Sequence, residues 1–110
     1  MNGRCYLKKS EDFSLVHSAG RWQSSKILTV KYLKNDLGYA RWGIVASKKI
    51  GGAVTRNHVK RQIREIMRAQ SLKPGFDIVI LARQSITCES FSNIDCTIHT
   101  ILKKCDLLVD

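Results

Sequence analysis

The sequence has 110 residues, of which 44% are hydrophobic and 25% are charged, with a formal charge of +10. This composition is typical of one folded domain with a modest core, and it excludes a disordered tail. The longest apolar run, residues 78–82, is too short to cross a bilayer, and charged residues interrupt any N-terminal signal segment. We therefore expect a single domain over residues 1–110, no membrane association and a cytoplasmic location.

The positive charge is concentrated in the first two-thirds of the chain. Residues 1–68 contain 15 Lys or Arg and 4 Asp or Glu, a net charge of +11, whereas residues 69–110 contain 4 and 5, a net charge of −1. A polyphosphate partner is therefore expected to contact the first part, with the remainder as scaffold. The four cysteines have no paired spacing of the kind that zinc sites use. We expect reduced cysteines, buried in the C-terminal segment, and no metal site.

The first predicted element is a short helix over residues 7–20. Ser10 is a candidate N-cap, and the acidic pair that follows it suits the positive end of the helix dipole. Phe13, Val16 and His17 fall on one face at helical spacing. For Val16, ordinary core packing is the favoured interpretation.

Two strands are predicted next, over residues 21–23 and 27–33. Side chains alternate along the second strand, so its two faces have different surroundings. The residues expected to face the core are Leu28, Val30 and Tyr32. Thr29 and Lys31 lie on the opposite face.

A turn at 34–38 leads to a strand over residues 39–46, which is predicted to form a hairpin with the strand before it. Later in the chain, residues 76–82 are almost continuously apolar, which is typical of an inner strand. Residues 85–90 are predicted to form a loop. A capping-box pattern at 92–95 then begins a C-terminal helix, whose role we expect to be scaffold.

The segment between these strands, residues 47–68, carries the strongest functional signal. From residue 54 its apolar side chains fall on one helical face, and five cations lie on an arc beside that face. Positions 56, 60, 64 and 68 are all Arg or Lys, so like charges face one another at i,i+4 and repel. A solvated face usually mixes charges of both signs, so this pattern favours binding of nucleic acid.

Residues 47–65 read S-K-K-x-G-x-A-V-x-R-N-x-x-K-R-x-x-R-E, which resembles the arginine-rich signature of the bacterial ribonuclease P protein component. The similarity extends to residues 7–13 and 75–83, and so to most of the chain. The predicted element order αβββαβα corresponds to a two-layer α/β sandwich with a mixed sheet. The resemblance further implies a left-handed β-α-β crossover through the central helix, although such connections are right-handed as a rule.

In that family the RNA subunit, with Mg²⁺, hydrolyses the phosphodiester at the 5′ end of precursor tRNA, and the protein binds this RNA and guides the leader. The resemblance therefore implies an endoribonuclease holoenzyme in which this chain holds no catalytic residue. It implies contact with the catalytic RNA for Ser47, Lys48, Lys49, Arg56, Asn57, Lys60, Arg61, Arg64 and Arg68. It implies a leader-binding cleft lined by Phe13, His17, Thr29 and Lys31. The chain departs from the family at His58, where Arg is usual, and at His17 and Lys31, where aromatic residues are usual.

Two other functions remain open from the sequence. A structural RNA-binding module, such as a small ribosomal protein, would also carry a cationic helix, and only the length of the motif match argues against it. An independent metal-dependent nuclease would need clustered carboxylates, whereas the nine acidic residues here are scattered.

Overall fold

The computed structural model describes residues 6–109. Its elements, in chain order, are α1 (Ser10–Ala19), β1 (Arg21–Ser24), β2 (Leu28–Lys34), β3 (Arg41–Val45), α2 (Ala53–Arg68), β4 (Phe76–Ala82), the 3-10 helix η1 (Gln84–Cys88) and α3 (Phe91–Lys104). The predicted order αβββαβα is confirmed. The short helix η1 occupies most of the segment that was predicted to be a loop.

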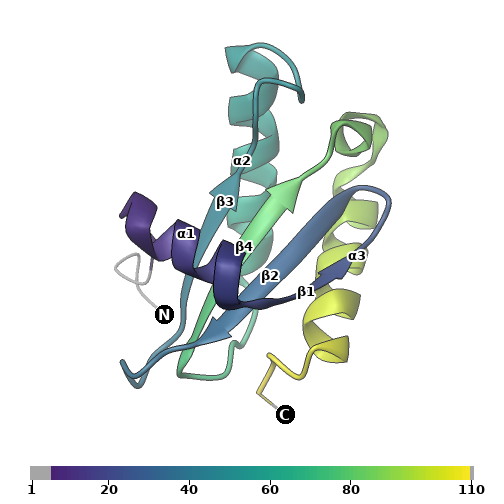
Figure 1. Ribbon diagram of the computed structural model, residues 1–110. Helices are drawn as coiled ribbons and strands as arrows, with labels where there is room; N and C mark the ends of the chain where they lie inside the picture. The colour runs from purple at the N-terminus through teal and green to yellow at the C-terminus, as the bar shows by residue number, and fades with distance from the viewer. Residues whose placement is uncertain (1–5, 110) are drawn as a thin grey trace.

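The four strands form one mixed sheet in the order β1-β2-β4-β3 (Figure 1). β1 with β2 and β2 with β4 are antiparallel, whereas β3 and β4 are parallel. The predicted hairpin between residues 27–33 and 39–46 is therefore wrong, because β4 lies between these two strands. β4 is buried along most of its length, as expected of an inner strand. It pairs with β3 along an apolar stretch, and its buried Asp77 forms an ion pair with Arg41 of β3.

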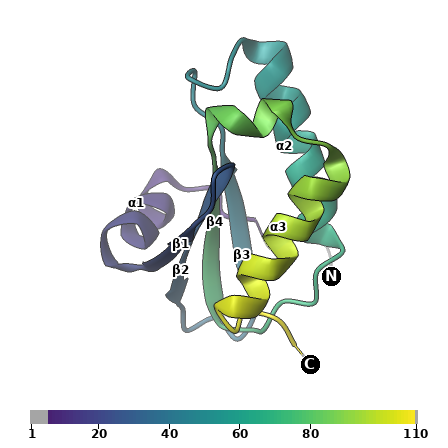
Figure 2. The ribbon, with the colours of Figure 1, turned by 90° about the vertical axis from the view of Figure 1, so that its right-hand side faces the viewer.

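The helices cover both faces of the sheet. α2 and α3 pack on one face and α1 lies on the other (Figure 2). When the sheet is viewed from the α2 side with β3 and β4 pointing upward, β4 lies to the left of β3 (Figures 1 and 2). The connection from β3 through α2 to β4 is therefore left-handed, as the family resemblance implied. Residues 6–109 contain no helix that combines the length and the apolar character needed to cross a membrane.

Each side of the sheet has its own hydrophobic cluster. The larger one, under α2 and α3, includes Leu28 and Val30, both fully buried, with Tyr32 packed at its edge. These three residues face the core as predicted. The smaller cluster, under α1, is built on Leu7, Val16 and Val79. Because this second cluster is small, part of the α1 face of the sheet stays open.

The helix starts differ from the predicted ones. α1 begins at Ser10, after Lys9, and no side chain caps it, so Ser10 is not the N-cap. Residues before it extend the sheet instead, since the backbone N–H of Leu7 donates to the carbonyl of Trp42 at 2.9 Å. α3 is capped by Ser90, whose hydroxyl accepts from the N–H of Asn93 at 3.2 Å. This cap lies two residues before the predicted capping box, because Ser90 is the last extended residue before the helix.

The cysteines are only partly as expected. Cys88 and Cys96 are exposed, and Cys105 is partly buried against the main core; all three are free thiols. The expectation of burial is therefore wrong for Cys88 and Cys96, because both lie on the outer surfaces of their helices. Burial raises the pKa of the Cys105 thiol. Cys5 lies outside the described residues.

Candidate nucleic-acid interface

The cationic side of α2 is the first part of the candidate interface. The helix buries one apolar face, made of Val59, Ile63, Ile66 and Met67, as the sequence predicted. With that face fixed on the sheet, the predicted cations are left on the side that faces away from the core. Arg61 and Arg68 are exposed, whereas Arg56, Lys60 and Arg64 are partly buried.

Around the middle of α2 these side chains border a shallow hollow of about 530 Å³, lined by Val54, Asn57, His58, Lys60, Arg61 and Arg64. Arg61 donates to Nδ1 of His58 at 3.4 Å, so the histidine lies within the hollow where the family usually has arginine. The ion pairs found in residues 6–109 involve Arg41 and Lys73, and none includes a cation of α2. The like-charge ladder on this helix is therefore not neutralised by that part of the protein.

Arg56 and Arg68 lie at the two ends of this ladder. Nε of Arg56 is buried and has no acceptor among the described residues. Nε of Arg68 donates to the hydroxyl of Tyr6 at 3.0 Å, and the ring of Tyr6 packs edge-on against Trp42. The C-terminal end of the ladder is thus fixed to the segment before α1.

The predicted residues Ser47, Lys48 and Lys49 form the exposed turn that leads into α2. Ile50 is buried and anchors this turn, and its N–H donates to the carbonyl of Ser47 at 3.0 Å. Gly51 has a φ of 151°, and a Cβ there would lie 3.2 Å from the side chain of Thr55. A glycine is therefore required where the chain turns into the helix, and the turn holds its two lysines at the N-terminal end of the cationic face.

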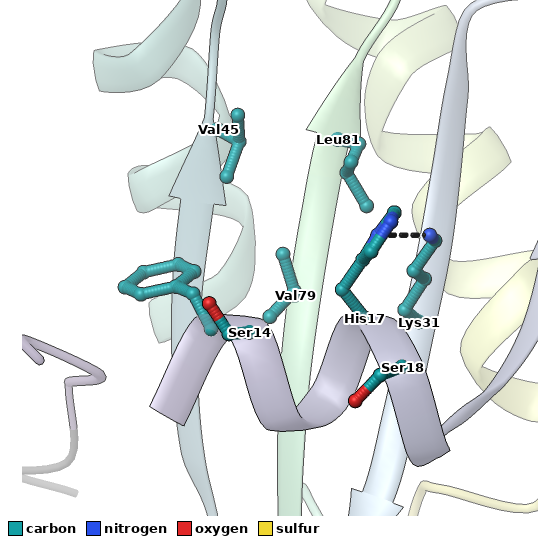
Figure 3. A pocket seen from close by; sticks show the side chains of 8 residues that line it. Ser14, His17, Ser18, Lys31, Val45, Val79 and Leu81 are labelled. Atoms are coloured by element: carbon teal, nitrogen blue, oxygen red, sulfur yellow. Dashed lines mark hydrogen bonds between the residues drawn. The ribbon is translucent and has the colours of Figure 1, made fainter. Parts of the chain in front are cut away.

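A cleft between α1 and the open face of the sheet is the second part of the candidate interface (Figure 3). Its volume is about 500 Å³, and its lining consists of Phe13, Ser14, His17, Ser18, Lys31, Val45, Val79 and Leu81. The structure thus brings together three of the four predicted cleft residues. Thr29 is on the same face of β2 but does not line the cleft; its hydroxyl is hydrogen-bonded to that of Ser24 in β1 at 2.9 Å.

Sequence reasoning missed the floor of this cleft. Val79 and Leu81 alternate with core residues along β4, and Val45 lies beside Leu81 in the neighbouring strand. Residues 76–82 are almost continuously apolar, so the sequence does not reveal which face of β4 is open. The floor could be recognised only once α1 was placed on the sheet.

One side of the cleft is closed by a hydrogen bond between α1 and β2. Nζ of Lys31 donates to Nδ1 of His17, and the two side chains point toward one another in Figure 3. The ammonium group of a lysine can only donate, so Nδ1 of His17 is the acceptor in this contact. The two cleft residues that depart from the family pattern therefore interact directly.

Phe13 connects the cleft with the cationic side of α2. Its ring lies directly over Gly43, where an added Cβ would approach the ring to 2.4 Å. The same ring borders a second hollow, which Lys60 and Arg64 of α2 also line. Although α1 and α2 lie on opposite faces of the sheet, the cleft and the cationic face therefore adjoin one another across β3.

Among residues 6–109, no three or more His, Cys, Asp or Glu side chains are grouped so that they could hold a metal ion. The expected action of Mg²⁺ with an RNA subunit stays a prediction, as does the lack of a metal site in this chain.

A cationic helical face beside a partly apolar cleft with an aromatic wall is typical of proteins that bind nucleic acid. The family model described as Ribonuclease P matches residues 1–106. The ribonuclease P protein component of Clostridioides difficile is 42% identical over 106 residues, covering 94% of this chain and 93% of the relative. That of Mesoplasma florum is 40% identical over 94 residues, covering 83% and 86%.

Solved structures agree with the sequence relatives. The ribonuclease P protein of Thermotoga maritima superposes with a TM-score of 0.83 at 32% identity, covering 92% of this chain and 97% of that one. The Staphylococcus aureus protein gives a TM-score of 0.83 at 28% identity, covering 96% and 98%.

The chain belongs to the ribonuclease P protein component family. It is thus a protein subunit of a tRNA-processing endoribonuclease, and this subunit works with an RNA subunit and tRNA substrates. Membership of the family does not assign catalysis to this chain.

Proposed function

We propose that the chain binds its partners through two adjoining surfaces. The cationic side of α2 and the turn before it bind the backbone of the catalytic RNA, through Ser47, Lys48, Lys49, Arg56, Asn57, Lys60, Arg61, Arg64 and Arg68. The cleft beside α1 binds the single-stranded 5′ leader of precursor tRNA, through Phe13, His17 and Lys31, with Thr29 at its margin. Mg²⁺ would act with the RNA subunit, which would perform the hydrolysis.

The observation that carries this proposal is the position of Phe13 between the two surfaces. The ring borders both the cleft and the hollow lined by Lys60 and Arg64. A leader in the cleft would therefore lie next to RNA bound along α2. This arrangement supports a role in holding substrate and ribozyme together, for which the chain needs no catalytic group of its own.

The chemistry of the side chains suits these two roles. Guanidinium groups make paired hydrogen bonds to phosphate oxygens, and Asn57 can bond a phosphate, a 2′-hydroxyl or a base edge. In the cleft, Phe13 offers a stacking surface, while Lys31 adds a charge that attracts the backbone. Because the cleft contains one phenylalanine and the His17–Lys31 pair, electrostatic attraction should contribute a larger share of leader binding than stacking.

Reconstitution of the holoenzyme tests the proposal. Purified protein alone should not cleave precursor tRNA, and cleavage should appear when the RNA subunit is added. In this assembly, Phe13→Ala should reduce the ratio of precursor to mature tRNA affinity about fivefold or more, because one base–aromatic stack is lost. Binding to the catalytic RNA should be unchanged.

Leu15→Ala is the matched control, since Leu15 is an exposed apolar residue of α1 that does not line the cleft. It should leave the affinity ratio as it is in the wild type. An unchanged ratio for Phe13→Ala would refute the leader assignment, and cleavage by the protein free of RNA would refute the division of labour.

A further inference from the structure

Trp22 in β1 is the most exposed aromatic side chain in the described part of the chain, with 64% of its surface accessible. Single exposed apolar residues are common and need no special explanation. Its position in the sheet, however, relates it directly to the cleft.

The register of the sheet places Trp22 on the cleft side. Trp22 lies opposite Lys31 in the antiparallel pair of β1 and β2, and the side chains of opposed residues share a face. Lys31 reaches His17 of α1, so its face is the one that α1 partly covers. Trp22 therefore lies just beyond the His17–Lys31 pair, on the side away from Phe13.

A single row crosses the sheet from Trp22 through Lys31 and Val79 to Gly43. The ring of Phe13 rests on Gly43, so an aromatic ring stands at each end of the row with a cation between them. Three strand spacings separate the ends, about 14 Å, which is about four base steps of roughly 3.4 Å. The row is long enough for several nucleotides of a single strand.

We propose that Trp22 is a second stacking platform for the 5′ leader, an inference that rests on the proposed function of the cleft. Proteins that bind single strands combine aromatic rings, on which bases stack, with cations that attract the backbone. The row from Phe13 past Lys31 to Trp22 has this composition. Phe13 adjoins Lys60 and Arg64, the surface proposed for the ribozyme, so Trp22 contacts the part of the leader farther from the ribozyme.

The test uses the reconstituted holoenzyme and precursor tRNAs whose leaders increase in length one nucleotide at a time. Trp22→Ala should weaken binding about fivefold for leaders long enough to cross the sheet, the low end of a base–aromatic stack. It should leave short leaders and mature tRNA unaffected, and Trp22→Phe should restore most of the affinity. Phe91→Ala, which removes an exposed aromatic from α3 on the other side of the sheet, is the matched control and should match the wild type at every length.

Tryptophan fluorescence gives an independent readout, because the sequence contains two tryptophans and Trp42 is buried at 3% exposure. A precursor with a long leader should quench the emission of the wild-type protein more than mature tRNA does, and this difference should vanish in Trp22→Phe. If Phe13→Ala loses discrimination while Trp22→Ala binds all leaders like the wild type, the inference is overturned and the proposed function stands. If both variants behave as wild type, the leader-binding function of the cleft fails as well.

Discussion

Asp77 is the buried charged residue of the described part of the chain, with 4% of its surface exposed. It accepts hydrogen bonds from Nε and Nη2 of Arg41, at 2.9 and 2.6 Å, and from the side-chain amide of Asn35 at 2.7 Å. Arg41 also reaches Asp12 of α1 at 3.3 Å. Asp77 raises the pKa of Arg41, and the network fixes α1 to the sheet, which holds Phe13 and His17 over the cleft.

Asp77→Ala should therefore destabilise the protein by about 3 kcal/mol, because it leaves the largely buried guanidinium of Arg41 with Asp12 as its remaining acidic partner. Urea denaturation measures this difference in the free energy of unfolding. Asp36→Ala removes the same charge from an exposed turn and should change the free energy of unfolding by no more than about 0.5 kcal/mol. Equal effects of the two substitutions would contradict the role given to the buried pair.

At the scale of single residues, the sequence predicted the kind of site a residue belongs to better than it predicted which residues contact one another. The cleft assignments of Phe13, His17 and Lys31 came from a family pattern, and the structure brings the three together. The ion pair of Asp12 with Arg41 could not be predicted, because the residues are 29 positions apart and Asp12 also fits the start of a helix. A binding role for Trp22 could not be predicted, because it depends on Lys31, the residue opposite it in the sheet.

The cationic helix α2 contains charges that repel one another and so lower its stability. Arg56, Lys60, Arg64 and Arg68 form three consecutive like-charge pairs at i,i+4. Each such pair destabilises a helix by about 0.2–0.5 kcal/mol in solution. The burial of four apolar side chains of α2 offsets this repulsion in the folded protein.

Salt should consequently stabilise the free protein. Raising NaCl from about 0.01 M to about 1 M shortens the screening length from about 30 Å to about 3 Å, which should increase the free energy of unfolding by about 1 kcal/mol through the ladder. Thermal or urea unfolding at the two salt concentrations measures the change. Lys60→Gln removes a cation that has two ladder neighbours and should reduce the salt effect, whereas Lys26→Gln, at an exposed position outside α2, should reduce it less. A salt response that is the same in both variants would show that the ladder is not its source.

At the scale of elements, the sequence predicted which segments are helices and strands, but not which strands are neighbours. The apolar stripe of α2 identified its buried face, because a single amphipathic period has one solution. The pairing of β2 with β3 was wrong because periodicity reports faces and says nothing of lateral order. The displaced cap of α3 has a similar origin, since Ser90 and Ser92 near its start are both chemically suitable, whereas α1 begins without a side-chain cap.

For the whole molecule, the distribution of charge matters more than its total. The net charge is +11 in residues 1–68, which include α1, β1, β2, β3 and α2, and −1 in residues 69–110, which include β4, η1 and α3. α3 nevertheless ends with two lysines, Lys103 and Lys104. They suit the negative end of the helix dipole and lie on the element that we expect to serve as scaffold.

This division predicts different effects of equal charge changes. Arg61→Ala and Arg64→Ala should each lower the salt dependence of binding to the catalytic RNA by about one phosphate contact, a change of roughly 0.7–0.9 in the logarithmic slope, with a clear loss of affinity. Lys103→Ala combined with Lys104→Ala removes two charges at once and should leave both quantities nearly unchanged. Filter binding at several salt concentrations measures them. If the α3 variant loses as much affinity as the α2 variants, the interaction depends on total charge and α2 has no special role.

The place of β4 in the sheet has a consequence for biosynthesis. Among the four strands of the sheet, β3 pairs only with β4, yet β4 ends at Ala82, long after α2. When synthesis has reached Arg68, the residues of the cationic helix are therefore complete, while the strand β4 that helps to bury this helix has not yet been made. The sheet is complete only when β4 inserts between the earlier strands β2 and β3, so the surface that we propose to bind RNA is synthesised before the sheet that supports it.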